Sequence, residues 1–381
     1  MLSTILLATL TFSMIIAIFI FCRVINSRIR YRTHPITHED LPLDQIPSIT
    51  VAIPARNETH AMTRCLESII ASDYPKLEIL IIDDASVDNT SVLIKSFAHA
   101  GVRFIKGPPL PPGWMGRNFA YQVLSRAATG RYIFFMSVDT HITPTTITQL
   151  VDQLQQRNSE MISVLPVRLD APRFSVFFST LRFFNELIFH DFKTHPPVTS
   201  GAWLVNRELL SRYAGNLSNY SDDVQIESKI GQIFASHKQY SFILSSFASG
   251  VSYEKHWLSQ VETSIRIYAL SYRGAPIRQL IRFLVLLSFL APPITLAYSI
   301  FSLSFLILFL AVLSQTLLSV SFFLYARLAW SRGSILALFL FPFIAIQEFI
   351  IFIVATYKRH FGRITWKGRH VYSSKPSIRQ N

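Results

Sequence analysis

Hydrophobic residues are distributed unevenly along this 381-residue chain, with long apolar segments at its two ends. The run from Leu2 to Cys22 carries no charge and is about as long as a helix that crosses a ~30 Å hydrocarbon core. The stretch from Phe283 to Tyr325 is also uncharged, and a third apolar segment extends from Ile335 to Tyr357. The pattern predicts three outer regions: an N-terminal transmembrane anchor over residues 1–24, a C-terminal membrane region over 281–357 and a basic tail over 358–381.

Between these ends, short apolar runs alternate with segments of helical spacing. The predicted strands are Ile49–Ala55, Leu77–Asp83, Val102–Lys106, Tyr132–Met136 and Met161–Val167. The predicted helices are Glu58–Ser72, Asn89–Ala100, Gly116–Ala128 and Pro144–Arg157. Such alternation indicates an α/β domain, which we expect over residues 45–275, with a mostly parallel sheet and helices on both of its faces. Ligands bind such sheets beyond the carboxyl ends of the strands.

Two segments of this domain, about 174–192 and 257–275, are predicted to be interfacial helices at the bilayer surface. The first is rich in Phe and carries scattered charges such as Arg182 and Glu186. An ordinary core helix is the alternative interpretation of that segment.

The charges beside the first apolar run indicate how the chain is oriented. Four arginines follow the run directly: Arg23, Arg28, Arg30 and Arg32. A cleavable signal peptide has its charges before the apolar run, so we expect an uncleaved anchor. The positive-inside bias then predicts an integral membrane protein, in a bacterial inner membrane, whose soluble domain is cytoplasmic. With only Cys22 and Cys65 in the chain, we expect no disulfide framework.

The C-terminal apolar segments raise a question of topology. Pro292 and Pro293 interrupt the uncharged stretch, so we expect two crossings with a break at these prolines. A third crossing puts the basic tail outside, against the charge bias, and Glu348 in that third segment is costly in lipid. We therefore favour a re-entrant or interfacial third segment.

The formal net charge of +13 has a membrane explanation. Much of the excess lies beside apolar segments, in Arg23–Arg32 and in Lys358–Arg369, where anionic headgroups attract cations. No nucleic-acid recognition motif accompanies the charge, so we expect no nucleic-acid partner.

Polar clusters follow the first two predicted strands. They are Pro54, Arg56 and Glu58 after the first strand, and Asp83, Asp84 and Asp88 after the second. A carboxylate there can accept hydrogen bonds from the base or ribose of a nucleotide. Adjacent acids repel each other unless a partner compensates them, which favours a functional role for Asp84. Asp88 is better interpreted as a turn or N-cap residue.

Further candidates follow the third and fourth strands. Residues 107–118 form a loop dense in Pro and Gly that ends at a predicted helix N-terminus with Trp114 and Arg117, a setting that suits an anion. After the fourth strand come Ser137 and Asp139. A carboxylate there can bind a divalent metal that bridges the phosphates of a leaving nucleotide.

The last candidates lie farther along the chain. Asp222 and Asp223 open a predicted helical stretch, with Asp222 as its N-cap and Asp223 available as a base for the proton of an attacking hydroxyl. Arg266 and Arg369 can neutralise a diphosphate, and Trp366 lies close to Arg369 in the sequence. Each of these three is equally explained as a lipid-facing side chain.

Together these motifs resemble family 2 glycosyltransferases of the GT-A fold. The resemblance rests on Pro-Ala-Arg-Asn-Glu at 54–58, Asp-Asp-x-Ser-x-Asp at 83–88, Leu-Pro-Pro-Gly-Trp-x-Gly at 110–116 and the acid pair at 222–223. The Pro-Trp loop and Trp-Lys-Gly-Arg at 366–369 are similar to a membrane-attached subgroup that includes hopene-associated and carotenoid-type glycosyltransferases. The resemblance covers roughly residues 47–270.

The resemblance implies a role for each matching residue. Asp84 holds the base or ribose, Asp139 holds a divalent metal, Mg²⁺ or Mn²⁺, and Asp223 is the catalytic base. Arg266 contacts the donor diphosphate. Other implied donor-binding residues are Pro54, Arg56, Glu58, Trp114 and Arg117, with Asp83, Asp222, Ser137, Trp366 and Arg369 in support. The implied reaction moves a sugar from a nucleotide-sugar, which we expect to be a UDP-sugar, to a lipid acceptor, with inversion at the anomeric carbon.

Three departures from the family pattern matter. Ser137 replaces the first acid of the usual Asp-x-Asp, which predicts weaker metal binding. Arg117 replaces a common Lys and keeps the charge. The Gln that often precedes the family's arginine is absent, with Thr263 and Ser264 nearby, which argues against a processive polysaccharide synthase. That synthase and a catalytically silent, donor-binding scaffold are the alternative functions.

Overall fold

A computed structural model describes the chain over residues 2–30, 44–169, 175–191, 195–245, 250–272, 274–299, 305–362 and 364–372. The chain divides into two compact units. We call them the sheet unit, from residues 31–169 and 189–254, and the helical unit, from residues 1–30, 170–188 and 255–381.

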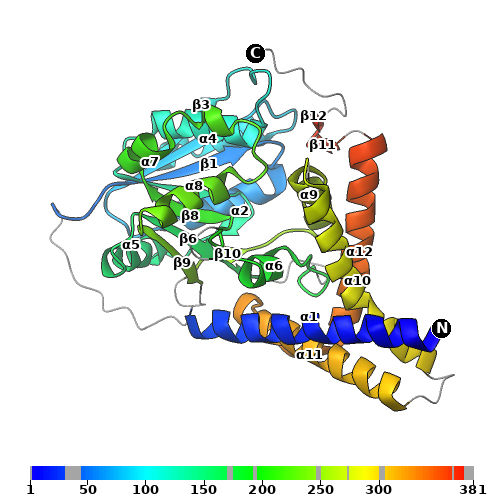
Figure 1. Cartoon of the computed structure of the whole chain (residues 1–381). Coiled ribbons are helices and arrows are strands. Elements are labelled where there is room, and N and C mark those ends of the chain that lie inside the picture. The colour runs from blue at the N-terminus through cyan, green and yellow to red at the C-terminus, as the bar shows by residue number, and fades with distance from the viewer. Residues whose placement is uncertain are drawn as a thin grey trace. The chain divides into compact units, whose positions relative to one another are not determined.

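The sheet unit is built on a seven-stranded sheet with the order β3-β2-β1-β4-β8-β6-β9 (Figure 1). Its strands are β1 (Ile49–Ala55), β2 (Leu77–Asp83), β3 (Val102–Lys106), β4 (Tyr132–Met136), β6 (Met161–Leu165), β8 (Ala202–Asn206) and β9 (Tyr240–Leu244). Only β8 runs antiparallel to its neighbours, and the other four pairings are parallel. The predicted mostly parallel α/β fold is therefore confirmed, and the first four strands have the predicted bounds.

Helices pack around this sheet (Figure 1). They are α2 (Thr59–Ile70), α3 (Thr90–Ser96), α4 (Gly116–Ala127), α5 (Thr146–Gln156), α7 (Arg207–Ala214) and α8 (Ile226–Ser236), with short 3-10 turns at Ala98–Ala100 and Leu217–Tyr220. Alternate residues of β1, such as Val51 and Ile53, belong to the same buried cluster as Leu66 and Ile69 of α2. The period-2 and helical apolar patterns thus meet in one core.

A small second sheet has the order β5-β10-β7. Its strands are β5 (Thr140–His141), β7 (Val167–Arg168) and β10 (Ser252–Tyr253). The predicted strand Met161–Val167 was wrong in its extent, because β6 ends at Leu165 and Val167 pairs with Ser252 in this other sheet. A strand that changes sheets cannot be recognised from an unbroken apolar run alone.

Within its described residues, the helical unit contains four helices that are long and apolar enough to cross a membrane. They are α1 (Leu2–Arg30), α10 (Pro276–Ser299), α11 (Phe305–Ala329) and α12 (Ala337–Phe361). The unit also contains α6 (Arg182–Ile188), α9 (Trp257–Ser271), a 3-10 turn at Ser334–Leu336, and a hairpin of β11 (Ile364–Trp366) and β12 (Arg369–Tyr372). The two predicted interfacial segments correspond to α6 and α9, and both group with the apolar helices.

The predicted break at Pro292–Pro293 was wrong, because α10 continues through both prolines to Ser299. A proline removes the hydrogen bond to the carbonyl four residues earlier, which for Pro292 is that of Ser288. The Ser13 hydroxyl of α1 donates to that carbonyl oxygen at 2.7 Å. A neighbouring helix therefore satisfies the acceptor that the proline leaves, as is usual in membrane helices.

Helix α12 runs unbroken for 25 residues, which is not the form of a re-entrant segment. The re-entrant interpretation rested on the free-energy cost of a charged Glu348 in lipid, yet this carboxylate is fully buried within the helical unit. It accepts a hydrogen bond from the Leu181 amide at 3.1 Å and lies 3.7 Å from the Arg282 guanidinium. Protein partners thus compensate the charge that we expected to be costly in lipid. How α12 meets a bilayer stays a prediction.

Candidate active site

The loops that follow β1 and β2 are joined at the carboxyl edge of the main sheet. The Arg56 guanidinium donates to the carbonyl oxygens of Asp84 and Ala85. Ala85 has a φ of 51°, a left-handed conformation that is unfavourable for a residue with a Cβ. Such strain persists only where surrounding contacts enforce it, and it clusters at functional sites. Arg56 therefore fixes the backbone that carries Asp84.

The adjacent acids of the β2 loop have different surroundings. The Asp83 carboxylate accepts hydrogen bonds from the Ser86 amide, 3.2 Å away, and from the Ser86 and Ser91 hydroxyls. These bonds make Asp83 part of the loop scaffold. Asp84 is also buried, and its role in ligand binding stays a prediction.

Asp88 is confirmed as a turn residue. Its carboxylate accepts from the Thr59 hydroxyl at 2.7 Å and from the Thr90 amide and hydroxyl at 3.0 and 2.6 Å. Burial alone favours the neutral acid, but these hydrogen bonds outweigh it and lower the pKa of Asp88 to about 2. The residue joins the start of α2 to the start of α3.

Three other predicted residues lie at this edge. Pro54 is the penultimate residue of β1, opposite Ile82 of β2. Glu58 precedes α2, and its amide donates to the Thr90 hydroxyl at 2.8 Å. Trp114 precedes α4 and packs edge-on against Phe119, with ring centroids 5.3 Å apart.

The start of α4 is bonded to the segment that carries the acid pair. The Met115 amide donates to the Ser221 carbonyl at 2.9 Å. The fully buried side-chain amide of Asn118 donates to the carbonyl oxygens of Tyr220, Ser221 and Asp223, at 2.9, 3.1 and 2.8 Å. Since α4 begins beyond the carboxyl end of β3, these bonds attach Asp223 to the edge that carries Asp84. Asn118 is the last residue of the predicted Pro- and Gly-rich loop, but no role was predicted for it.

Arg117 has partners within the protein. It donates to the Val224 carbonyl at 3.1 Å and forms an ion pair of 3.3 Å with the buried Glu227 of α8. Burial lowers the pKa of Arg117, but Glu227, Tyr121 and Tyr253 together outweigh it and the net shift is upward. The arginine therefore secures the 221–227 segment, and anion binding by Arg117 stays a prediction.

The acid pair precedes α8 by several residues. The predicted N-cap role of Asp222 was wrong, because α8 begins at Ile226 and Gln225 occupies the cap position. Asp222 is exposed and Asp223 is half-buried. Burial raises the pKa of Asp223, Lys229 opposes this shift and Asp222 adds to it. A carboxylate with a raised pKa is a better proton acceptor than an ordinary aspartate.

Asp139 lies in the turn between β4 and β5, and the small sheet brings Glu254 to it. The Glu254 amide donates to the Asp139 carbonyl at 2.9 Å, which continues the β5–β10 pairing. Alternation along β5 puts Asp139 and His141 on one face. The sequence analysis missed Glu254, because a pairing across more than 100 residues leaves no local signal. The Ser137 hydroxyl shares a 2.9 Å hydrogen bond with the Thr140 hydroxyl.

The surroundings of Asp139 are partly buried and charged. Glu254 forms an ion pair with Arg64 of α2. Burial, followed by the charge of Arg64, lowers the pKa of His141 to about 4, while Asp139 opposes the shift. The His141 imidazole is therefore neutral at pH 7, and its buried Nδ1 has no hydrogen-bond partner among the residues that the structure describes. Burial, with Asp139 and Glu58, raises the pKa of Cys65.

The remaining predicted residues belong to the helical unit. The buried Arg266 guanidinium of α9 lies over the Trp366 ring, 4.9 Å from its centroid, and the Lys367 ammonium lies 5.6 Å from the same centroid. Lys367 and Gly368 form the hairpin turn, both with positive φ, and Arg369 begins β12. The structure thus joins Arg266 to Trp366, residues that are 100 positions apart.

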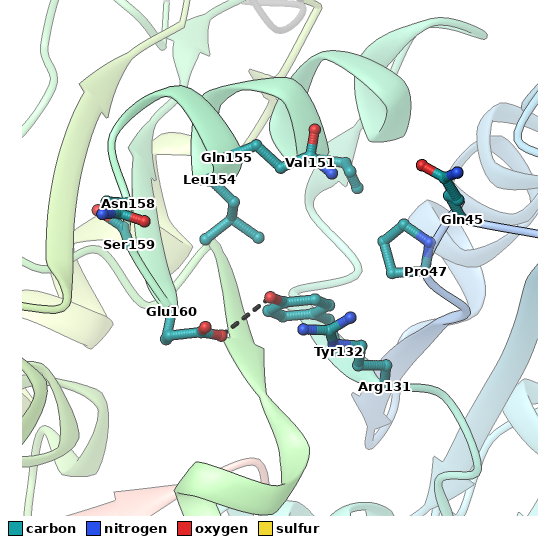
Figure 2. Close-up of a pocket in the computed structure, with 10 residues that line it drawn as sticks. All are labelled: Gln45, Pro47, Arg131, Tyr132, Val151, Leu154, Gln155, Asn158, Ser159 and Glu160. Carbon is teal, nitrogen blue, oxygen red and sulfur yellow. Dashed lines mark hydrogen bonds between the residues drawn. The ribbon is translucent and has the colours of Figure 1, made fainter. Parts of the chain in front are cut away.

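A cavity of about 170 Å³ lies at the opposite edge of the main sheet (Figure 2). It is lined by residues that include Pro47, Arg131, Tyr132 and Glu160, near the amino ends of β1, β4 and β6. The Tyr132 hydroxyl donates to the Glu160 carboxylate at 2.9 Å across it. None of the predicted site residues lines this cavity.

Comparison with known proteins identifies one family and several relatives. The family model described as glycosyl transferase family 2 matches residues 50–214. A 4,4'-diaponeurosporenoate glycosyltransferase of Staphylococcus aureus (strain MRSA252) is 28% identical over 170 residues, which are 44% of this chain and 42% of the relative. Its counterpart from strain bovine RF122 is 29% identical over 124 residues, 32% of each chain. The matches span less than half the length of these relatives.

The matches among solved structures include a mannosyltransferase and TarS, both with TM-scores below 0.5. The mannosyltransferase PcManGT from Pyrobaculum calidifontis, in complex with GDP-Man and Mn²⁺, has a TM-score of 0.49 and 17% identity, over 92% of this chain and 99% of that one. S. aureus TarS 1-349 in complex with UDP-GlcNAc has a TM-score of 0.37 and 14% identity, over 84% and 93%.

Proposed function

We propose that this chain, whose residues 50–214 match the model of glycosyl transferase family 2, transfers a sugar from a nucleotide-sugar to a lipid acceptor at a membrane. We propose a UDP-sugar as the donor and inversion at the anomeric carbon as the stereochemical outcome. The cytoplasmic face of a bacterial inner membrane is the proposed location.

The observation that carries the proposal is the common edge of the acidic loops. Asp84 follows β2 and Asp139 follows β4, the two strands that flank β1. Asp223 is bonded to the start of α4, which begins at the same edge. Ligands of open parallel sheets bind at this edge, and the hydrogen bonds of Arg56 and Asn118 hold its loops in place before a ligand binds.

The proposed chemistry needs one protein base. Asp223 accepts the proton of the acceptor hydroxyl as its oxygen attacks the anomeric carbon, while the bond to the nucleoside diphosphate breaks on the opposite side. The raised pKa of Asp223 suits this role at neutral pH. The departing diphosphate is a stable anion, so no second carboxylate has to protonate it, in contrast to glycoside hydrolysis.

The residues around Asp139 fit a divalent cation. A carboxylate oxygen is a hard ligand that suits Mg²⁺ or Mn²⁺, and the buried Nδ1 of His141 offers a further lone pair nearby. Within the described ranges, no group of three or more His, Cys, Asp or Glu side chains could hold a metal ion. Asp139 would hold the cation together with donor phosphates and water, and a bound cation supplies positive charge for the leaving diphosphate.

A lipid acceptor is proposed for two reasons. The four long apolar helices belong to the same chain as the domain. The S. aureus relatives are named diaponeurosporenoate glycosyltransferases, after a carotenoid acid. We infer an apolar, membrane-held acceptor with a hydroxyl group as the nucleophile.

The test uses the full chain purified in detergent with bacterial lipid extract. UDP- and GDP-sugars are screened for metal-dependent release of the nucleoside diphosphate and for transfer of label to the organic phase, and the product anomer is assigned by NMR. Asp223→Asn should abolish release and keep donor binding. Asp73→Asn, which changes an exposed aspartate, is the matched control and should behave like wild type. Absence of release with every donor would overturn the proposal.

A further inference from the structure

Two non-glycine residues adopt a left-handed main-chain conformation at the carboxyl edge of the main sheet. Asn57, which follows β1, has a φ of 50°, and Ala85, which follows β2, has a φ of 51°. Asparagine tolerates this conformation better than most residues, but the Cβ of alanine makes it costly. Such strain persists only where surrounding contacts enforce it. The loop of residues 84–89, which contains Ala85, therefore keeps its form through contacts with other parts of the fold.

Asn57 makes two of these contacts, both with the residues just after Ala85. The Asn57 amide donates to the Ser86 hydroxyl at 2.9 Å, and the Val87 amide donates to the Asn57 side-chain oxygen, also at 2.9 Å. Arg56 adds a bond of 2.9 Å to the Ala85 carbonyl oxygen. Three consecutive residues of the 84–89 loop are thus bonded to two consecutive residues that follow β1, and all five belong to the sheet unit.

The middle of the 84–89 loop has little apolar packing to hold it. The Val87 side chain is 87% exposed, and Ala85 is exposed as well. The carboxylates of Asp83 and Asp88 join the two ends of the loop to the first turn of α3. In the middle, the Val87 amide is bonded to the Asn57 side chain. Hydrogen bonds rather than packing therefore keep this part of the loop in its strained form.

We propose that Asn57 is a positioning residue for donor binding, which holds the 84–89 loop in its binding form before the nucleotide-sugar arrives. The inference rests on the proposed function, because it needs a nucleotide at the carboxyl edge of the main sheet, where ligands of such sheets bind. A loop that is already in its binding form loses little conformational entropy on binding. A loop that adopts this form only part of the time binds with a proportionally higher apparent Kd.

Calorimetry of UDP binding to the full chain in detergent, with Mg²⁺ present, tests the proposal without turnover. Asn57→Gly permits the left-handed main chain, since glycine has no Cβ, but removes the bond to the Val87 amide. We expect Kd for UDP to rise at least fivefold. Asn57→Ala removes the same bond and also disfavours the left-handed form, so its Kd should rise further. A wild-type Kd in Asn57→Gly would overturn the proposal.

A matched control separates the position from the type of substitution. Asn89→Gly changes an exposed asparagine of the same loop, whose side chain makes no capping bond to α3, and it should bind UDP like wild type. All titrations are made below the thermal unfolding midpoints of the variants, so that each variant is folded. Equal losses in Asn57→Gly and Asn89→Gly would contradict a specific role of Asn57.

A second substitution tests whether Asn57 acts through the loop. Ala85→Gly removes the Cβ that opposes the left-handed form, so in the Asn57→Gly background it should recover part of the lost affinity. A loss that Ala85→Gly does not recover would mean that Asn57 acts by another route, and would overturn the positioning role.

The remaining outcomes are also decisive. If Asn57→Gly alone does not fold, the double variant is compared with Ala85→Gly alone. The double variant should bind UDP more weakly, and equal Kd values would overturn the proposal. If wild type binds neither UDP nor GDP, the proposed function fails, and this inference fails with it.

Discussion

The side-chain amide of Asn118 donates a hydrogen bond of 2.8 Å to the main-chain carbonyl of Asp223, and it also donates to the carbonyls of Tyr220 and Ser221. A side chain 105 residues away in the sequence therefore fixes the main chain that carries the proposed base. The position of Asp223 relative to α4 is set by Asn118 rather than by the local turn.

Asn118→Ala should damage both stability and turnover. Loss of the amide removes the Asn118 hydrogen bond to the Asp223 carbonyl and one of the two hydrogen bonds that the Tyr220 and Ser221 carbonyls each accept, which costs about 2 kcal/mol of unfolding free energy. We expect kcat to fall at least tenfold while KM for the donor changes less, because the base loses its position and the nucleotide loops keep theirs. Denaturant unfolding and steady-state kinetics measure the two effects. Asn219→Ala, an exposed asparagine of the same segment, is the control, and equal effects of the two substitutions would contradict the prediction.

The pH dependence of turnover should report on Asp223. Its pKa is raised, chiefly by burial, and only the deprotonated carboxylate can take a proton. Activity should therefore fall as the pH drops through this raised pKa, at a higher pH than for an ordinary aspartate. Asp222→Asn removes the neighbouring charge that adds to the shift, so the acidic limb of the kcat profile should move to lower pH. A limb that stays in place or moves upward would argue against Asp223 as the titrating base.

Asp88 should make the free energy of unfolding depend on pH, in a lower pH range than the one in which turnover depends on Asp223. Its folded-state pKa, about 2, is below the ordinary value of 3.8. The contribution of Asp88 is therefore present above pH 3.8 and is lost as the pH falls through 2. Comparing the thermal unfolding midpoints of wild type and Asp88→Asn should show a difference at pH 6 that shrinks below pH 4. A difference independent of pH would mean that the hydrogen bonds of Thr59 and Thr90 do not depend on the charge.

The sequence predicted those parts of the fold that depend on local pattern. The strands of the first half, from β1 to β4, were visible as apolar runs, and these runs ended where the structure ends them. Glu254 was not visible, since its place opposite Asp139 arises from β10, a two-residue strand paired across the fold.

The errors in the membrane region share one physical origin. We expected Pro292–Pro293 to break a helix, because proline destabilises a helix interior. We expected Glu348 to avoid the bilayer, because a charge in lipid costs free energy. In the structure a neighbouring helix compensates each of them, through Ser13 and through Arg282. Compensation by distant residues is a tertiary property, and a single sequence gives no means to assign it.

The compensation at Pro292 can be tested by a double-mutant cycle. Ser13→Ala should lower stability by about 0.6 kcal/mol, the average for hydrogen bonds between membrane helices, because the Ser288 carbonyl loses its donor. Pro292→Ala restores an amide that can bond that carbonyl within α10, so Ser13→Ala should then cost less. Unfolding of the four variants in mixed micelles measures the interaction energy. Equal costs of Ser13→Ala in both backgrounds would show that Ser13 does not replace the bond that the proline removes, and that α10 tolerates Pro292 for another reason.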